Sequence, residues 1–219
     1  MKQIVLVVVF LALMIQGCQK QQLPHYTINP GLMSAWGFKT GTYWIYQDSL
    51  SGEVDSFVVV NTRFITNTQS MAIYDEYDVY ISTFNSDSFK FNYRMAIGDS
   101  GVSFINESIS NEMEFNLDYA VFTYPIYSGQ SYIITVNDST YVSEIFASLL
   151  INNGLYKNVA QIHHYSSVDQ GNVVLYQGIM KHNDWFYACD KVGFVKIVFN
   201  HPDDSVYRNW ELLRYHIEK

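Results

Sequence analysis

Residues 71–81 read MAIYDEYDVYI. The odd positions 71, 73, 77, 79 and 81 are apolar or aromatic, while Glu76 and Asp78 fall on the other face of an extended chain. Successive side chains of a β-strand point to opposite faces of the sheet, so this alternation is typical of a strand with one face buried. The stretch therefore predicts a half-buried β-strand and sets the pattern for the rest of the chain.

Similar alternation recurs along the chain in both directions from this stretch. The runs lie at 40–48, 54–66, 89–97, 101–106, 113–124, 131–136, 155–166, 172–182, 193–199 and 207–217. The polar breaks between them, many of them containing Asp-Ser, are too short for the helical crossovers that parallel strands need. The sequence predicts an all-β fold, an antiparallel meander that forms a barrel or a strongly curved sheet, with few or no helices.

One segment has a mixed pattern. Val142, Ile145, Phe146, Leu149 and Leu150 have helical spacing. A polar residue that could cap a helix precedes them, and an Asn-Gly pair that could end one follows. From these residues alone, both helix and strand are open for 141–151.

The first 18 residues have the order of an export signal. Lys2 precedes an apolar run from Ile4 to Ile15, which is shorter than the roughly 20 residues that span a bilayer. The sequence Ile15-Gln16-Gly17-Cys18 resembles the lipobox of bacterial lipoproteins, in which the cysteine becomes the lipid-bearing first residue.

The resemblance implies a signal peptide at 1–17 and lipid attachment at Cys18. The polar residues after Cys18 predict a lipidated tether at 18–30, and the remaining length suits a single domain at 31–219. No aspartate follows Cys18. The enteric signal for retention in the inner membrane is therefore absent, and neither is there the acidic cluster that some surface-exposed lipoproteins carry. The expected place is the outer membrane, facing the periplasm.

Charge and cysteine content limit the functional classes. The formal net charge is −8 for the whole chain, and removal of Lys2 with the signal would make it −9. An acidic domain without a stripe of Lys and Arg is a poor partner for nucleic acid, which requires clustered cations. Only two cysteines are present. If Cys18 is lipidated, Cys189 has no intrachain partner, and stability must come from packing.

Several pieces of the sequence resemble a group of Bacteroidota lipoproteins of unknown function. The pieces are Gly41-Thr42-Tyr43-Trp44-Ile45-Tyr46, Asn153-Gly154-Leu155-Tyr156-Lys157-Asn158-Val159, Phe186-Tyr187 followed by Val192-Gly193-Phe194-Val195-Lys196, and Trp210-Glu211-Leu212. The resemblance implies an antiparallel β fold, with a lipocalin-like barrel as one form of it, and it favours strands over a helix in 141–151. It supplies no catalytic residues.

The aromatic side chains are the candidate ligand-binding residues. Trp44 and Tyr46 share one face of a predicted strand, and with Trp185 and Tyr187 they could line a site for an apolar or glycan ligand. The alternative, which we favour, is that these rings are covered by the closing sheet and by the segment Leu32 to Phe38.

Catalytic and metal sites have weaker support. Cys189 with His163, His164 or His182 could form a thiol nucleophile and its base, but a single cysteine is more often a small packing residue. His163 and His164 are adjacent, so on a strand they point to opposite faces.

His182 with Asp184 could ligate a metal, but a solvated hairpin end is the favoured interpretation. The acidic pair at 203–204 is interpreted as a turn rather than a calcium loop. We therefore expect no catalytic residues, metal or cofactor.

The sequence predicts a membrane-tethered envelope lipoprotein with a non-catalytic binding or structural role. Its partners would be the membrane, through the lipid on Cys18, and other envelope proteins or a small ligand. A lipocalin-like carrier of an apolar or glycan molecule is the alternative, and a thiol-dependent hydrolase ranks last.

Overall fold

The computed structural model describes residues 22–69, 71–83, 92–106, 120–135, 138–169, 179–201 and 206–218. Within these ranges the chain is almost entirely β-strand, with one short helix. The elements are β1 (His25–Tyr26), α2 (Pro30–Trp36), β2 (Tyr43–Asp48), β3 (Val54–Gln69), β4 (Ala72–Thr83), β5 (Asn92–Ile97), β6 (Gly101–Asn106), β7 (Ala120–Thr123), β8 (Ser131–Thr135), β9 (Asp138–Ile151), β10 (Gly154–Asp169), β11 (Ile179–Cys189), β12 (Gly193–His201) and β13 (Val206–His216).

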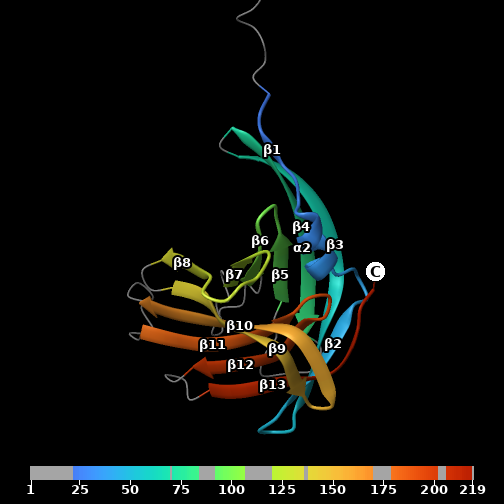
Figure 1. Ribbon diagram of the computed structural model, residues 1–219, viewed down its shortest axis with the longest axis vertical. Coiled ribbons are helices and arrows are strands. Elements are labelled where there is room, and N and C mark those ends of the chain that lie inside the picture. The colour runs from blue at the N-terminus through green and yellow to red at the C-terminus, as the bar shows by residue number, and fades with distance from the viewer. Residues whose placement is uncertain are drawn as a thin grey trace, which may run out of the picture.

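The strands form one sheet built from two meanders. Its order is β7-β6-β5-β4-β3-β2-β13-β12-β11-β10-β9-β8, and every neighbouring pair in this order is antiparallel. β2, the first strand of one meander, and β13, the last strand of the other, pair in the middle and join the two halves. Figure 1 shows β3 and β4 as a long curved ribbon, with β10 to β13 running across it. The predicted antiparallel meander is confirmed.

The sheet is strongly curved but remains open. β7 and β8 occupy its two ends, and no strand ladder joins them in the described part of the chain. Residues 124–130 carry the chain from one end to the other, and the amide of Gly129 donates to the carbonyl of Val142 (2.9 Å) on the far half. Of the two predicted forms, the curved sheet is therefore the one observed, rather than a closed eight-stranded barrel of the lipocalin kind.

Residues 72–81 lie in β4, between β3 and β5, and Met71 lies in the turn before it and is 82% exposed. Val79 and Ile81 are buried in the core as predicted, whereas Asp78, predicted on the other face, is also buried and lies 3.1 Å from Arg94. The segment 141–151, which was open between helix and strand, belongs to β9. β9 is paired on one side with β8 and on the other with β10, after a two-residue turn in which Asn152 has a positive φ of 49°. Pairing on both edges fixes the extended form despite the helical spacing.

The helix α2 covers the core side of the sheet. It starts at Pro30, and the side chain of Asn29 caps it by accepting the amide of Gly31 at 2.8 Å. Leu32 and Trp36 are fully buried, and the ring of Phe38 packs edge-on against Trp44 with centroids 4.9 Å apart. The expected covering of Trp44 by Leu32 to Phe38 is therefore confirmed.

Two boundaries differ from the predicted ones. The strand expected at 172–182 is observed as β11, from 179 to 189, while 172–178 lie outside the described residues. Within the segment predicted as a tether, His25 and Tyr26 pair in parallel with Ile73 and Tyr74 of β4. The rings of Tyr26 and Tyr74 stack at 5.0 Å, so this part of the chain is attached to the domain.

None of the helices in the described residues is both long and apolar enough to span a lipid bilayer.

Candidate functional site

The structure separates the four aromatic residues proposed for ligand binding into two pairs. Trp44 and Tyr46 are core residues, with only 3% and 2% of their surface exposed. The indole N–H of Trp44 donates to the carbonyl of Val192, and the phenol of Tyr46 donates to the carbonyl of Phe194 at 2.7 Å. These two side chains therefore hold β2 against the β11–β12 hairpin and do not line an open ligand site.

The second pair lies on the other face of the sheet. Trp185 and Tyr187 are half-buried, whereas Phe186 and Ala188, which alternate with them on β11, are buried in the core. Since neighbouring residues of a strand point to opposite faces, the alternation places Trp185 and Tyr187 on the outer, solvent-facing side. The predicted site is thus divided by the sheet itself.

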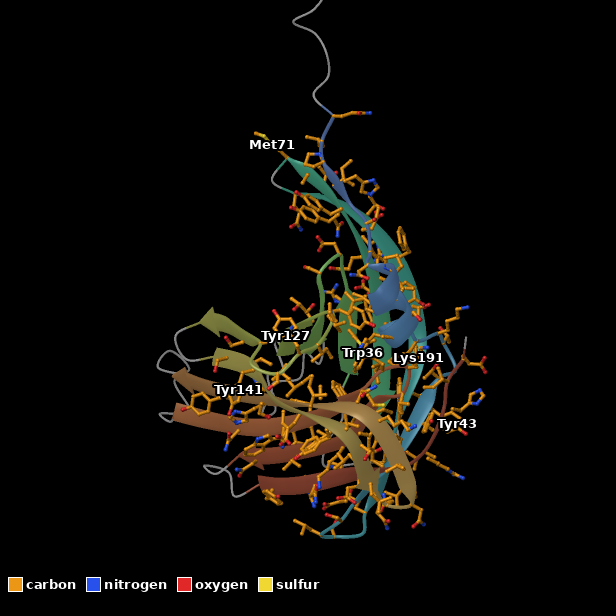
Figure 2. The ribbon with its side chains drawn as sticks, in the orientation of Figure 1. Trp36, Tyr43, Met71, Tyr127, Tyr141 and Lys191 are labelled. Carbon is orange, nitrogen blue, oxygen red and sulfur yellow. The ribbon has the colours of Figure 1, made fainter. Side chains whose placement is uncertain are left out.

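Strand pairing adds two more rings to this outer face. His163 of β10 is the cross-strand partner of Trp185, and Tyr141 of β9 is the partner of His163. The His163 and Trp185 rings stack with centroids 4.8 Å apart, and Tyr141 meets His163 edge-on, also at 4.8 Å. We call Tyr141, His163, Trp185 and Tyr187 the aromatic strip. Figure 2 shows Tyr141 in front of the β10–β11 part of the sheet, away from α2.

Polar side chains border the strip and bind one another. The amide of Gln161 donates to the phenol oxygen of Tyr187 at 2.7 Å, and the hydroxyl of Ser143 donates to the Gln161 side-chain oxygen at 2.8 Å. His163 is hydrogen-bonded to the side-chain oxygen of Asn183. These bonds fix the orientation of the amide groups before any ligand arrives.

A charged pair extends the same face toward β13. The ammonium of Lys196 lies 5.8 Å from the centre of the Tyr187 ring and 2.9 Å from a carboxylate oxygen of Glu211. Donors and acceptors of several kinds therefore lie beside exposed ring surface, with Tyr141 40% exposed. Such a surface can stack against an apolar ligand face while it hydrogen-bonds to hydroxyl groups around it.

Sequence reasoning did not assign Tyr141, Gln161 or Lys196 to a site. Each is an ordinary strand residue, and the sequence does not reveal which residues of β9, β10 and β12 lie opposite Trp185 and Tyr187. His163 was considered only as a partner for Cys189. The alternation of side chains along a strand could have grouped these residues, since 161 and 163 share one face of their strand just as 185 and 187 share one face of theirs.

The structure does not bring Cys189 and a described histidine together. Cys189 is 7% exposed, and its thiol lies 3.5 Å from the carbonyl oxygen of Lys157. His163 is opposite Trp185, four residues from Cys189, which is about 13 Å along a strand. Burial, with a further contribution from Asp190, raises the pKa of the Cys189 thiol. This environment suppresses the thiolate that a nucleophile would need.

His164 points to the opposite side of β10 from His163, as predicted. It is 1% exposed, and its Nδ1 atom lies 3.1 Å from the hydroxyl of Thr140. Its cross-strand partner Asp184 is 2% exposed and accepts the backbone amide of Asn200 at 3.0 Å. The expected solvated hairpin end is therefore wrong for Asp184, which is a buried residue within β11.

The remaining candidate ligands fall outside the described side chains. Nothing is described of the His182 side chain or of the acidic pair at 203–204. Among the residues that the structure does describe, no three His, Cys, Asp or Glu side chains gather in a way that could hold a metal ion.

No protein-family model and no curated protein matches the chain. Two solved structures are similar in backbone. One is a candidate lipoprotein from Parabacteroides distasonis, 12% identical, covering 83% of this chain and 99% of that one, with a TM-score of 0.41. The other is a candidate exported protein with a YmcC-like fold from Bacteroides fragilis, 10% identical, covering 82% and 98%, with a TM-score of 0.43. At these identities and TM-scores neither likeness bears on function.

Proposed function

We propose that this protein is a non-catalytic lipoprotein of the bacterial envelope that binds glycan chains on the aromatic strip. A lipid on Cys18 would anchor it in the outer membrane, with the domain facing the periplasm. A purely structural role without a glycan ligand is the alternative that the experiment below must distinguish.

The anchor rests on the N-terminal sequence. The short apolar run and Ile15-Gln16-Gly17-Cys18 match the order in which a lipoprotein signal is recognised and cut. Each buried methylene of an acyl chain contributes about 0.8 kcal/mol, so two or more chains hold a protein of this size firmly at a membrane.

The observation that carries the binding role is the aromatic strip itself. Three rings, from Tyr141, His163 and Trp185, lie in contact across three neighbouring strands on the solvent side of the sheet. Cross-strand pairs of rings are common in sheets, but a group of three rings that extends over three strands is larger than such a pair and makes this face a candidate binding surface.

The chemistry around the strip favours a glycan over a purely apolar molecule. Sugar rings have one apolar C–H face for stacking and a rim of hydroxyl groups that both donate and accept hydrogen bonds. The strip offers ring surface for the first and the side chains of Gln161, Asn183 and Lys196 for the second. These groups already bind one another, but each keeps further donor or acceptor capacity, such as the second amide hydrogen of Gln161, which an apolar ligand would cover without supplying a partner.

The curved interior of the sheet is not the proposed site. Trp44, Tyr46, Phe186, Phe199 and Leu212 pack together there as part of the core. A ligand in that place would have to displace these side chains, whereas the aromatic strip is open to solvent.

The test is binding of soluble oligosaccharides to the mature domain, with Cys18 replaced by Ser. Cellohexaose, chitohexaose and mannohexaose are titrated by calorimetry into the parent domain and into Trp185→Ala. We expect at least one of them to bind the parent domain and to lose affinity about tenfold or more in Trp185→Ala. Stacking of a nucleic-acid base on one aromatic ring is worth about 1–3 kcal/mol, and we expect a stacked sugar ring to contribute at the lower end of that range.

The matched control is Tyr74→Ala. Tyr74 is also an exposed strand aromatic in a stacked pair, with Tyr26, but it lies on β4 outside the strip. Equal loss in both variants, or no binding by any of the three oligosaccharides, would contradict the glycan role and leave the structural one.

A further inference from the structure

A groove of about 620 Å³ opens beside α2. Its walls come from α2, from the turn between β11 and β12, and from the chain after β13. Met33, Phe38, Val192 and Ile217 supply apolar surface. Figure 2 shows Lys191 on this side, next to Trp36, whereas Tyr141 lies on the other side of the view. The two sites therefore share no residue.

The walls of the groove are held together by hydrogen bonds that backbone amides donate. The amide of Lys191 donates to the carbonyl of Ala35 at 2.9 Å, which joins the β11–β12 turn to the helix. The amide of Glu218 donates to the hydroxyl of Thr42 at 3.0 Å, which holds the C-terminal chain against the start of β2. Beneath the helix, Trp36 packs on Phe194 with ring centroids 5.6 Å apart. The groove is thus formed before a ligand binds.

The rim of the groove carries two lysines and one carboxylate, although the whole chain carries −8. Lys39 and Lys191 line it and are exposed. Within the part of the chain that the structure describes, neither ammonium lies in an ion pair. The carboxylate on the rim, Glu218, is already hydrogen-bonded to the His216 ring at 2.9 Å. Asp190, next to Lys191, also interacts with the Lys191 ammonium. An anionic group placed between Lys39 and Lys191 would therefore meet two cations in the lining against the one carboxylate of Glu218.

We propose that this groove binds one free fatty acid, with its acyl chain along the apolar floor and its carboxylate beside Lys39 and Lys191. The apolar walls favour a ligand with a hydrocarbon chain, and the two lysines favour an anionic group at one end of it. A volume of about 620 Å³ lies within the roughly 300–1,000 Å³ of small-molecule sites and suits one chain rather than a two-chain phospholipid. This site goes beyond the glycan role and does not depend on it.

The experiment measures binding of laurate to the soluble domain by calorimetry, below the concentration at which laurate forms micelles. The key variant is Lys39→Glu with Lys191→Glu, and dodecanol serves as the uncharged ligand of the same chain length. We expect laurate affinity to fall about tenfold or more in the double variant, with dodecanol affinity unchanged. Lys157→Glu changes an exposed lysine outside the groove and should leave both ligands unaffected.

A second variant tests the groove without touching its charges. Ser34 is exposed on α2 and lines the groove, so Ser34→Trp fills it from the solvent side and should abolish binding of both ligands. Unfolding midpoints of all variants establish that they are folded. The proposal is overturned if laurate fails to bind, if it still binds Ser34→Trp, or if the double variant loses laurate and dodecanol equally. It is also overturned if the domain binds only vesicles of phosphatidylglycerol and no free laurate.

Discussion

The imidazole ring of His163 stacks on the indole ring of Trp185, with centroids 4.8 Å apart and planes inclined by 25°. The two residues are 22 positions apart in the sequence and meet because β10 and β11 are paired in one particular register. A shift of that register by one residue would turn His163 inward and expose His164 instead. The proposed glycan surface therefore depends on strand pairing, and the pairing depends on the core beneath it.

Tyr46→Phe tests that core. The phenol of Tyr46 donates to the carbonyl of Phe194 at 2.7 Å, and burial, with a further contribution from Tyr156, raises its pKa, so that it stays protonated. Removing the hydroxyl leaves a buried carbonyl without its donor, and we expect a loss of about 1–3 kcal/mol in the free energy of unfolding. Urea unfolding measures this loss. The glycan affinity of the folded variant should be unchanged. A loss of glycan affinity in a variant that is still folded under the assay conditions would contradict the placement of Tyr46 away from the site.

Asp48 gives the protein a predictable sensitivity to acid. Burial by itself would raise the pKa of Asp48, but hydrogen bonds from the Ser51 hydroxyl and from the amides of Asn209, Leu50 and Ser51 outweigh it and hold the pKa below its ordinary value. Arg208 lies 3.3 Å from the same carboxylate. The unfolded chain therefore binds a proton at Asp48 more tightly than the folded one does.

It follows that the stabilisation from Asp48 is complete above about pH 4 and is lost as the pH falls through its lowered folded value. We expect Asp48→Asn to cost about 1–3 kcal/mol at pH 7 and progressively less below pH 4. Urea unfolding of both proteins at several pH values measures the difference. A difference that stays constant from pH 7 to pH 3 would contradict this account.

Cys189 should be inert in the folded protein. Its thiol is buried and its pKa is raised, so little thiolate forms at neutral pH and reagents cannot reach it. In the Cys18→Ser protein it is the remaining one of the two cysteines. Reaction with a disulfide reagent should then follow unfolding and accelerate as urea is added, and Cys189→Ala should keep full glycan affinity. Rapid labelling in the absence of urea would revive the thiol-enzyme hypothesis.

The lipid anchor makes a prediction in cells. Cys18→Ser should abolish labelling with radioactive palmitate, because it removes the thiol that receives the lipid, and should leave residues 1–17 uncut. Cys189→Ser is the matched control and should keep its label. Labelling of Cys18→Ser would contradict attachment through this residue.

The sequence was sufficient to predict the all-β class and the antiparallel meander. The alternation in 71–81 is confirmed at Val79 and Ile81, which are buried, but not at Met71, which is 82% exposed, or at Asp78, which is buried on the opposite face. The ambiguity at 141–151 came from helical spacing of Val142, Ile145 and Leu149. The segment is a strand because it pairs with β8 and β10, and the residues of the segment alone do not reveal this pairing.

The site was less predictable, for a different reason. Trp44 and Trp185 have similar sequence contexts, since each is followed two positions later by a tyrosine, Tyr46 or Tyr187. Whether such a residue faces the core or the solvent depends on the curvature and register of the whole sheet. Asp184 shows the same limit from the polar side, because its burial depends on the backbone amide of Asn200 in the next strand.

The central claim is that the aromatic strip is the glycan-binding surface, and mapping of backbone amide shifts by NMR tests it most directly. The oligosaccharide with the highest affinity among cellohexaose, chitohexaose and mannohexaose is titrated into the isotopically labelled domain. The account predicts saturable shifts at the amides of residues 141–143, 161–163 and 183–187, and unchanged amides around Met33 and Lys191 beside α2. Shifts confined to another face of the sheet, or none at saturating oligosaccharide, would contradict it.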